Sequence, residues 1–293
     1  MRPLPLTAKA AVQAGGVKSL LKRALGDTVV AQLRAWQGAP RRRVLQWVLA
    51  RRARPEALPG GPALVIAPHP DDEVFATAGL LALKAQADAR VGVAFLTSGE
   101  ASHQRCCGAP VEEIARARRL LACEAGARLG LGPQAMHWLG LPDGRLPRNG
   151  QEGFATAVSA VAEVLRQAAP QEVYAPHPLD CWADHAAASE IVAQAVRRSG
   201  FPCAVHWYLV WGWYKLPLRR LAEPGLANAW KLDIAPVLSA KRQAIRCYRQ
   251  AVAPRCGKPY IGVLPPGFAA PFEAPSEVFF TPSGATPASA GEG

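Results

Sequence analysis

Short apolar runs alternate with longer amphipathic segments between residues 63 and 211. The short runs are continuously apolar, as in strands that a sheet buries on both faces, and the longer segments repeat apolar residues at helical spacing. The predicted strands cover residues 63–67, 91–96, 136–139, 173–175 and 204–211, and the predicted helices cover 74–87, 112–131, 154–168 and 185–198. This order predicts an α/β fold, namely a Rossmann-like, doubly wound, mainly parallel sheet with helices on both faces.

The two ends of the chain differ from this body. Residues 17–55 repeat leucine and valine near helical spacing and carry many arginines, whereas the final segment PSGATPASAGEG is small and polar. The segment PEALPGGP, between residues 17–55 and the first predicted strand, has the Pro and Gly content of a linker. We therefore predict a basic helical extension over residues 1–60, one domain over 61–281 and a disordered tail over 282–293.

The net charge of +12 is concentrated near the N-terminus. Residues 1–60 hold 12 Lys and Arg against two acidic residues, while the remaining 22 basic and 20 acidic side chains nearly cancel. This distribution argues against an enzyme that binds nucleic acid along a basic face. Residues 17–55 have two open interpretations: a helix that contacts an anionic membrane peripherally or binds an acidic partner, or a helix packed on the domain with solvated arginines.

Cysteine usage and hydropathy favour a cytoplasmic protein, including one that is peripheral to a membrane. The seven cysteines form no CxxC pair and no regular spacing, which argues against a disulfide framework. No apolar run approaches the ~18 residues of a membrane span, and the N-terminus lacks the apolar core of a signal peptide. We interpret Cys106 and Cys107 as loop residues, and His103, His137 and His206 as isolated structural histidines.

Two loops concentrate histidine and acidic residues at strand ends. The sequence PHPDDE over residues 68–73 follows the first predicted strand, and PHPLDCWADH over 176–185 follows the strand at 173–175. In doubly wound sheets, ligands bind beyond the carboxyl ends of the strands, so both loops lie where a site is expected. His and Asp are standard ligands of Zn²⁺, and the pairing of the two loops favours a metal site.

An alternative interpretation needs no ligand. Asp and Glu at the start of a helix cap free backbone N–H groups and interact favourably with the helix dipole. Asp71, Asp72 and Glu73 directly precede the helix predicted from residue 74, and Glu73 fits this role well. On this interpretation both acidic loops are helix caps.

The motif PHPDDE after a hydrophobic strand resembles the signature of the LmbE/PIG-L family of N-acetylglucosaminyl de-N-acetylases. Several weaker motifs follow in the order of that family. They are TSGE at 97–100, AGARLG at 125–130, LGLPDG at 139–144, DH at 184–185, DI at 233–234 and YRQ at 248–250. The resemblance covers about residues 63–280 and leaves residues 1–60 outside it.

The resemblance implies a metal-dependent amidohydrolase that acts on an amino sugar. The family pattern assigns a Zn²⁺ ion to His69, Asp72 and His185, and the role of general base to Asp71. Histidine and carboxylate ligands suit Fe²⁺ as well. Metal-bound water would attack the acetamide carbonyl, and Asp71 would pass the proton to the departing amine. The expected function is removal of an N-acetyl group from a GlcNAc-containing glycoconjugate or glycolipid.

Substrate contacts are less specific. Asp143 resembles a family position near the sugar hydroxyls, although a turn before Gly144 would favour Asp in any case. Arg118 lies on the predicted helix at 112–131, where it could meet a phosphate or hydroxyl of the substrate or remain on the surface.

One motif departs from the family. Family members commonly have His-Pro-Asp-His where this chain has Trp182-Ala183-Asp184-His185. Trp182 cannot carry the positive charge of the missing histidine, and His177, earlier on the same loop, is a candidate replacement with the alternative of a solvated loop residue. The departure keeps open a non-catalytic or weakly active glycan-binding relative. A metal-dependent esterase of nucleotides or phosphates is disfavoured, because no Gly-rich phosphate loop follows the first strand.

Overall fold

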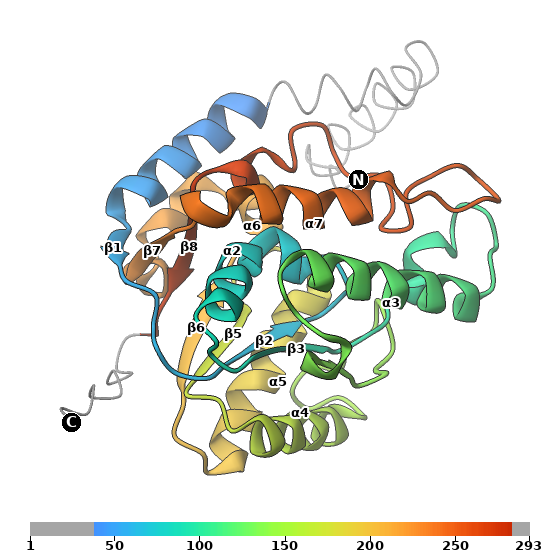
Figure 1. Ribbon diagram of the computed structural model, residues 1–293, viewed down its shortest axis with the longest axis horizontal. Helices are drawn as coiled ribbons and strands as arrows, with labels where there is room; N and C mark the ends of the chain where they lie inside the picture. Colours follow the sequence, from blue (N-terminus) through green and yellow to red (C-terminus); the bar gives the residue numbers. More distant parts are fainter. Residues whose placement is uncertain (1–37, 283–293) are drawn as a thin grey trace, which may run out of the picture.

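In the computed structural model, residues 38–282 are described, and their centre is a mainly parallel sheet of eight strands (Figure 1). The strands are β1 (Arg54–Glu56), β2 (Ala63–Ala67), β3 (Val91–Phe95), β4 (Met136–Trp138), β5 (Glu172–Pro176), β6 (Ala204–Tyr208), β7 (Ala229–Asp233) and β8 (Ser276–Phe280). They lie in the order β1-β7-β8-β6-β5-β2-β3-β4. Strand β8 runs antiparallel to both of its neighbours, and the other pairs of adjacent strands are parallel.

Helices form a layer on each side of the sheet. They are α2 (Asp72–Gln86), α3 (Val111–Arg128), α4 (Phe154–Ala168), α5 (Ala183–Ser199), α6 (Gly212–Lys215) and α7 (Leu238–Gln250), together with a helix over residues 38–52. Helices α2, α3 and α7 pack together above the sheet in the view of Figure 1, and α4 packs on α5 below it. The predicted doubly wound α/β fold is confirmed.

The five predicted strands correspond to β2–β6 and the four predicted helices to α2–α5, with shifted ends. The helix predicted to residue 131 ends at Arg128, because Gly130 has a φ of 82° and the N–H of Leu131 bonds back to the Gly126 carbonyl. The strand predicted to residue 211 ends at Tyr208, because the next N–H groups turn toward a carboxylate on another loop.

Strand β2 occupies the point where the sheet changes direction. Its five residues are all buried, and it pairs with β3 on one side and with β5 on the other. The chain continues from β2 to β3 and β4 on one side and then returns to β5 and β6 on the other. Such a switch point separates the loops that follow the two central strands and leaves a crevice between them. The loops after β2 and β5 are the two acidic loops of the sequence.

Residues 38–56 pack on this domain. Leu45 and Leu49 of the helix over 38–52 are fully buried, and β1 pairs with β7 although its segment was predicted to begin a linker. Arg41 donates hydrogen bonds to the backbone carbonyls of residues 214–216. The rest of the predicted extension, residues 1–37, and the predicted tail from residue 283 lie outside the described residues. No helix within the described part combines the length and apolar character that a membrane crossing requires.

Candidate active site

The two acidic loops meet, as predicted, and bring His69, Asp72 and His185 together. Asp72 Oδ2 lies 3.1 Å from Nδ1 of His69 and 3.2 Å from Nε2 of His185. Asp72 begins α2 after the β2 loop, and His185 lies in the first turn of α5 after the β5 loop. These three ligand atoms lie within 4.8 Å of one another, so one divalent cation can contact all three.

A buried carboxylate fixes the orientation of His185. Asp180 Oδ2 lies 2.6 Å from Nδ1 of His185, and Asp180 Oδ1 accepts the N–H groups of Val210 and Gly212 at 2.7 Å each. Because Nδ1 donates its proton to Asp180, Nε2 is the nitrogen that can take up a second proton or bind a metal cation. Nε2 is buried and has no hydrogen-bond partner among the described residues. A buried nitrogen in this position is suited to a metal ligand, because a cation can replace the proton.

The neighbouring charges determine the protonation of His185 and Asp72. Burial lowers the pKa of His185, but the Asp72 and Asp180 carboxylates outweigh burial and raise the pKa to about 9. Burial raises the pKa of Asp72, but the neighbouring His185 and His69 outweigh burial and lower the pKa of that carboxyl well below its usual range. A proton on the imidazole therefore balances Asp72 where a metal cation would otherwise do so.

The other nitrogen of His69 faces two further aspartates. Nε2 lies 3.0 Å from Asp184 Oδ2 and 3.2 Å from Asp143 Oδ1. When Nε2 donates to these carboxylates, Nδ1 keeps its lone pair on the side of Asp72. Asp184 also accepts the N–H of Gly144 at 2.8 Å, which fixes the 143–146 turn to the start of α5.

Asp71 lies beside the group in a strained conformation. Its φ of 137° is uncommon for a residue with a side chain, and its carboxylate lies 3.4 Å from Nη2 of Arg118. Arg118 also donates to the carbonyls of Pro70 and Gly99, so it fixes the loop in position as well as pairing with the Asp71 carboxylate. Burial raises the pKa of Asp71 to about 7, against the lowering effect of Arg118.

Helix capping alone does not account for the acidic loop. Asp71 is the N-cap residue of α2 but its side chain makes no capping hydrogen bond. Asp72 accepts the N–H of His69 at 3.0 Å while also facing both imidazoles. Glu73 accepts the N–H of Asp71 at 2.8 Å, as expected for a residue that stabilises the turn, and its other oxygen accepts the hydroxyl of Tyr248 at 2.6 Å.

A cavity of about 710 Å³ opens above these residues. Its floor is formed by His69, Asp71, Asp72, Asp143 and Asp184. Trp182 and Trp211 line one side with their rings stacked at 4.5 Å and 12°, and Nζ of Lys215 lies 4.2 Å from each ring centre. Further walls come from Ala101, Ser102, Gln104, Arg105 and residues 261–264. The volume and the mixed polar and aromatic lining suit a small ligand such as one or two sugar units.

The remaining predicted residues differ in position. Asp143 and Arg118 both line the cavity, although Asp143 Oδ2 is also occupied by the N–H of Ala101 at 2.6 Å. The structure does not bring His177 to the cavity. Its Nε2 bonds to the Gly225 carbonyl at 2.9 Å and its Nδ1 accepts the N–H of Leu179 at 3.0 Å, so both nitrogens hold the loop after β5.

Sequence reasoning gave no role to Asp180 or Tyr248. The position of Asp180 five residues before His185, in a loop already rich in ligands, was the available signal. Tyr248 donates to Glu73 from 175 positions away in the chain, so no local sequence pattern indicates this contact. The interpretation of His103 as isolated is wrong, because its Nδ1 lies 3.2 Å from the sulfur of Cys106. His206 is structural and stacks on Tyr174.

The fold and the site define an α/β protein with a histidine- and carboxylate-lined cavity at the switch point of a doubly wound sheet. Residues 64–196 match the family model of PIG-L, described as GlcNAc-PI de-N-acetylase. Residues 64–196 are therefore similar to the PIG-L family, and the resemblance read from the sequence motifs is confirmed. The match supports an enzyme, a deacetylase.

Solved structures share the fold at low sequence identity. N,N'-diacetylchitobiose deacetylase from Pyrococcus horikoshii is 21% identical over 66% of this chain and 71% of its own, with a TM-score of 0.51. The A40926 pseudoaglycone deacetylase is 20% identical over 76% and 97% of the two chains, with a TM-score of 0.58. A 4-carboxy-2-hydroxymuconate hydratase from Pseudomonas putida KT2440 is 23% identical over 64% and 78%, with a TM-score of 0.50. Because the fold also serves a hydratase, the reaction must be argued from the site.

Proposed function

We propose that this protein is a metal-dependent deacetylase that removes the N-acetyl group from a GlcNAc-containing glycoconjugate or glycolipid. The observation that carries the proposal is the buried Nε2 of His185, which makes no hydrogen bond to any described residue and lies 3.2 Å from Asp72 Oδ2 beside His69 on the floor of the cavity. The PIG-L family match supports the same reaction class.

The residues present fit a catalytic rather than a structural metal. Nδ1 of His69, a carboxylate oxygen of Asp72 and Nε2 of His185 give three protein ligands, which leaves a position open to water or substrate. Imidazole and carboxylate ligands suit Zn²⁺ and also Fe²⁺. When bound, such an ion lowers the pKa of a water molecule and polarises the amide carbonyl.

Asp71 is the proposed general base. Its carboxyl lies next to the ligand group without belonging to it, and its pKa of about 7 allows it to accept a proton near neutral pH. Asp71 would take the proton of the attacking water and then deliver it to the amine, since an amide nitrogen leaves readily only after protonation. Arg118 would keep the carboxylate of Asp71 in position during both transfers.

The cavity walls suit a sugar ring. The stacked indoles of Trp182 and Trp211 offer a flat apolar surface for the C–H face of a pyranose, and carboxylates on the floor can accept its hydroxyl groups. Lys215 adds a positive charge to the aromatic wall, which favours a substrate with an anionic group nearby.

The test compares acetate release and metal content in the full chain and in Asp71→Asn. N,N'-diacetylchitobiose and GlcNAc-phosphatidylinositol are suitable probes, and Asp88→Asn is the matched control because Asp88 is exposed and also has a positive φ. We expect Asp71→Asn to retain the metal and lose ~10²–10⁴-fold in turnover. A wild-type chain that binds metal but deacetylates no GlcNAc compound would contradict the proposal.

A second candidate function is glycan binding with little or no turnover. It is favoured by Trp182, which places an indole in the cavity wall where family members commonly have a histidine. The variant Trp182→His separates the two. Turnover that is absent in the wild type and present in the variant would support the binding function, and turnover already present in the wild type would exclude it.

A further inference from the structure

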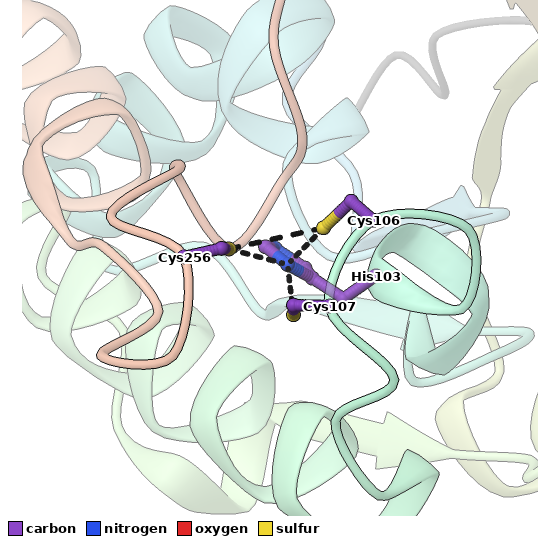
Figure 2. Close-up of side chains that lie close together, drawn as sticks. All are labelled: His103, Cys106, Cys107 and Cys256. Atoms are coloured by element: carbon purple, nitrogen blue, oxygen red, sulfur yellow. Dashed lines mark hydrogen bonds between the residues drawn. The ribbon is translucent and has the colours of Figure 1, made fainter.

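A second group of metal-binding side chains lies outside the proposed active site. His103 ends the short helix over Glu100–His103, Cys106 and Cys107 follow in the next turn, and Cys256 lies in the loop after α7 (Figure 2). Nδ1 of His103 lies 3.2 Å from Cys106 Sγ, 3.6 Å from Cys107 Sγ and 3.5 Å from Cys256 Sγ. The sulfurs of Cys106 and Cys256 are 3.8 Å apart. We call these four residues the Cys₃His cluster.

The distances match a tetrahedral site. With metal–sulfur bonds of about 2.3 Å and a metal–nitrogen bond of about 2.0–2.1 Å, the edges of a tetrahedron are ~3.8 Å between sulfurs and ~3.6 Å between sulfur and nitrogen. The observed separations therefore fall close to those of a filled site. All four ligand atoms lie within 4.8 Å of one another.

The histidine has the protonation that a ligand requires. His103 is buried, and its Nε2 lies 2.9 Å from the carbonyl oxygen of Pro259. A carbonyl can only accept, so Nε2 carries the proton and Nδ1 directs its lone pair at the three sulfurs. A backbone carbonyl that orients the far nitrogen is the usual support of a metal-bound histidine.

A disulfide explains the cluster less well. A Cys106–Cys256 bond would use two of the four side chains, and it requires the sulfurs to approach from 3.8 Å to about 2.05 Å. It would leave Cys107 and the oriented nitrogen of His103 without a role. A tetrahedral cation uses all four ligands at the distances already present.

We propose that the Cys₃His cluster binds a structural Zn²⁺ ion, separate from the metal of the active site. Four protein ligands leave no open position, and three thiolates select zinc over the harder cations. The ion would join the segment 103–107 to the loop after α7, which are about 150 residues apart in the chain.

The joined segments are the ones that form a wall of the cavity. Ser102 and Arg105 line it from one segment, and Ile261 and Leu264 line it from the other. The loop from residue 251 to 275 contains one isolated β-bridge, between Val252 and Pro259, and one short 3₁₀ helix, so no α-helix or sheet strand fixes its position. Ser102 donates to the Tyr260 carbonyl at 2.8 Å, and the zinc site would strengthen this contact between the two segments.

The Cys₃His cluster can be distinguished from the active site because only the cluster contains sulfur. Cobalt-loaded, reduced wild-type protein should show an intense sulfur-to-cobalt charge-transfer band, which His and carboxylate ligands cannot give. Cys256→Ser and Cys106→Ser should lose this band and one equivalent of metal. Cys247→Ser is the matched control, since Cys247 lies on α7 outside the cluster and should keep both.

A measurement on the unmutated chain covers the case in which these variants fail to fold. Titration of zinc-loaded wild type with an organomercurial should release one equivalent of zinc as the cluster thiols react, while the active-site ion remains. The absence of a charge-transfer band, or mercurial treatment that releases no zinc, would overturn the proposal. A Cys106–Cys256 disulfide in protein purified under reducing conditions, found by peptide mass mapping, would also overturn it.

Discussion

Asp180→Asn should disable the proposed metal site without removing any of its ligands. Asp180 is fully buried, and its two carboxylate oxygens accept hydrogen bonds from different groups. Oδ1 accepts the N–H groups of Val210 and Gly212, and Oδ2 accepts the proton of His185 Nδ1 and, at 3.2 Å, the N–H of Trp211. Asparagine has one oxygen and one NH₂ group, so it cannot serve both sides.

Each orientation of the asparagine amide has a cost. If its oxygen keeps the two backbone N–H groups, its NH₂ group faces His185 Nδ1, which must then become the acceptor. The proton moves to Nε2, and that nitrogen can no longer bind a metal. If the amide flips, its NH₂ group faces the N–H groups of Val210 and Gly212, which are also donors. The two hydrogen bonds that these groups make to the Asp180 carboxylate are then lost, and each such bond to a charged group contributes about 1.5–3 kcal/mol. We therefore expect metal affinity to fall ~10–100-fold, which is about 1.4–2.7 kcal/mol.

Metal affinity should be measured by competition with a chelator, and acetate release by titration with added metal. Saturating metal should restore part of the activity of Asp180→Asn, because all three ligands remain. Asp233→Asn is the control: Asp233 is exposed and accepts a single backbone N–H, that of Ala235 at 2.9 Å. If Asp180→Asn binds metal as tightly as the wild type, the argument that Asp180 fixes the tautomer of His185 is wrong.

Three further outcomes can be measured. Lys241→Met should lower the free energy of unfolding by about 3–5 kcal/mol in urea titrations, because it leaves the buried carboxylate of Glu277 without its ion-pair partner at 2.6 Å. Burial lowers the pKa of His206 to about 4. Below pH 6.5 the unfolded chain therefore binds a proton that the folded chain excludes, so the free energy of unfolding falls as pH drops. His206→Gln should remove up to about 3 kcal/mol of this decrease between pH 6.5 and 4. An unchanged dependence of stability on pH would refute this. Trp182→Ala should raise KM for a GlcNAc substrate ~3–10-fold by removing the ring stacked on Trp211, and an unchanged KM would exclude the aromatic wall as a sugar contact.

The parts of the fold that sequence could predict are those whose signal is local. Strands β2–β6 are short and mostly apolar, and the helices between them repeat at helical spacing. Strands β7 and β8 read AWKLD and SEVFF, and neither forms a continuous apolar run. Glu277 within β8 is tolerated because Lys241 and the N–H groups of Gly79 and Leu80 reach it from distant segments. Nothing near β8 in the sequence indicates those partners.

The candidate site shows the same limit. His69 and His185 could be paired because both follow strands that a parallel sheet brings to one edge. The Cys₃His cluster could not, because three of its members lie within residues 103–107 and the fourth is Cys256 on a loop of irregular structure. A search for CxxC pairs overlooks the spacing HxxCC, and the missing ligand is supplied only by the tertiary structure.

The backbone at Asp71 explains why an acidic loop of this kind is kept. A residue other than glycine with a φ of 137° costs on the order of 1–3 kcal/mol. A capping loop would not need this conformation, since Asp and Asn cap helices from the ordinary extended region. Here Arg118 holds the strained loop in place, because it donates to the Pro70 and Gly99 carbonyls and also lies beside the Asp71 carboxylate. The result is a carboxylate beside Asp72 that lines the cavity and does not cap its own helix, an arrangement that suits the proton transfer proposed for Asp71.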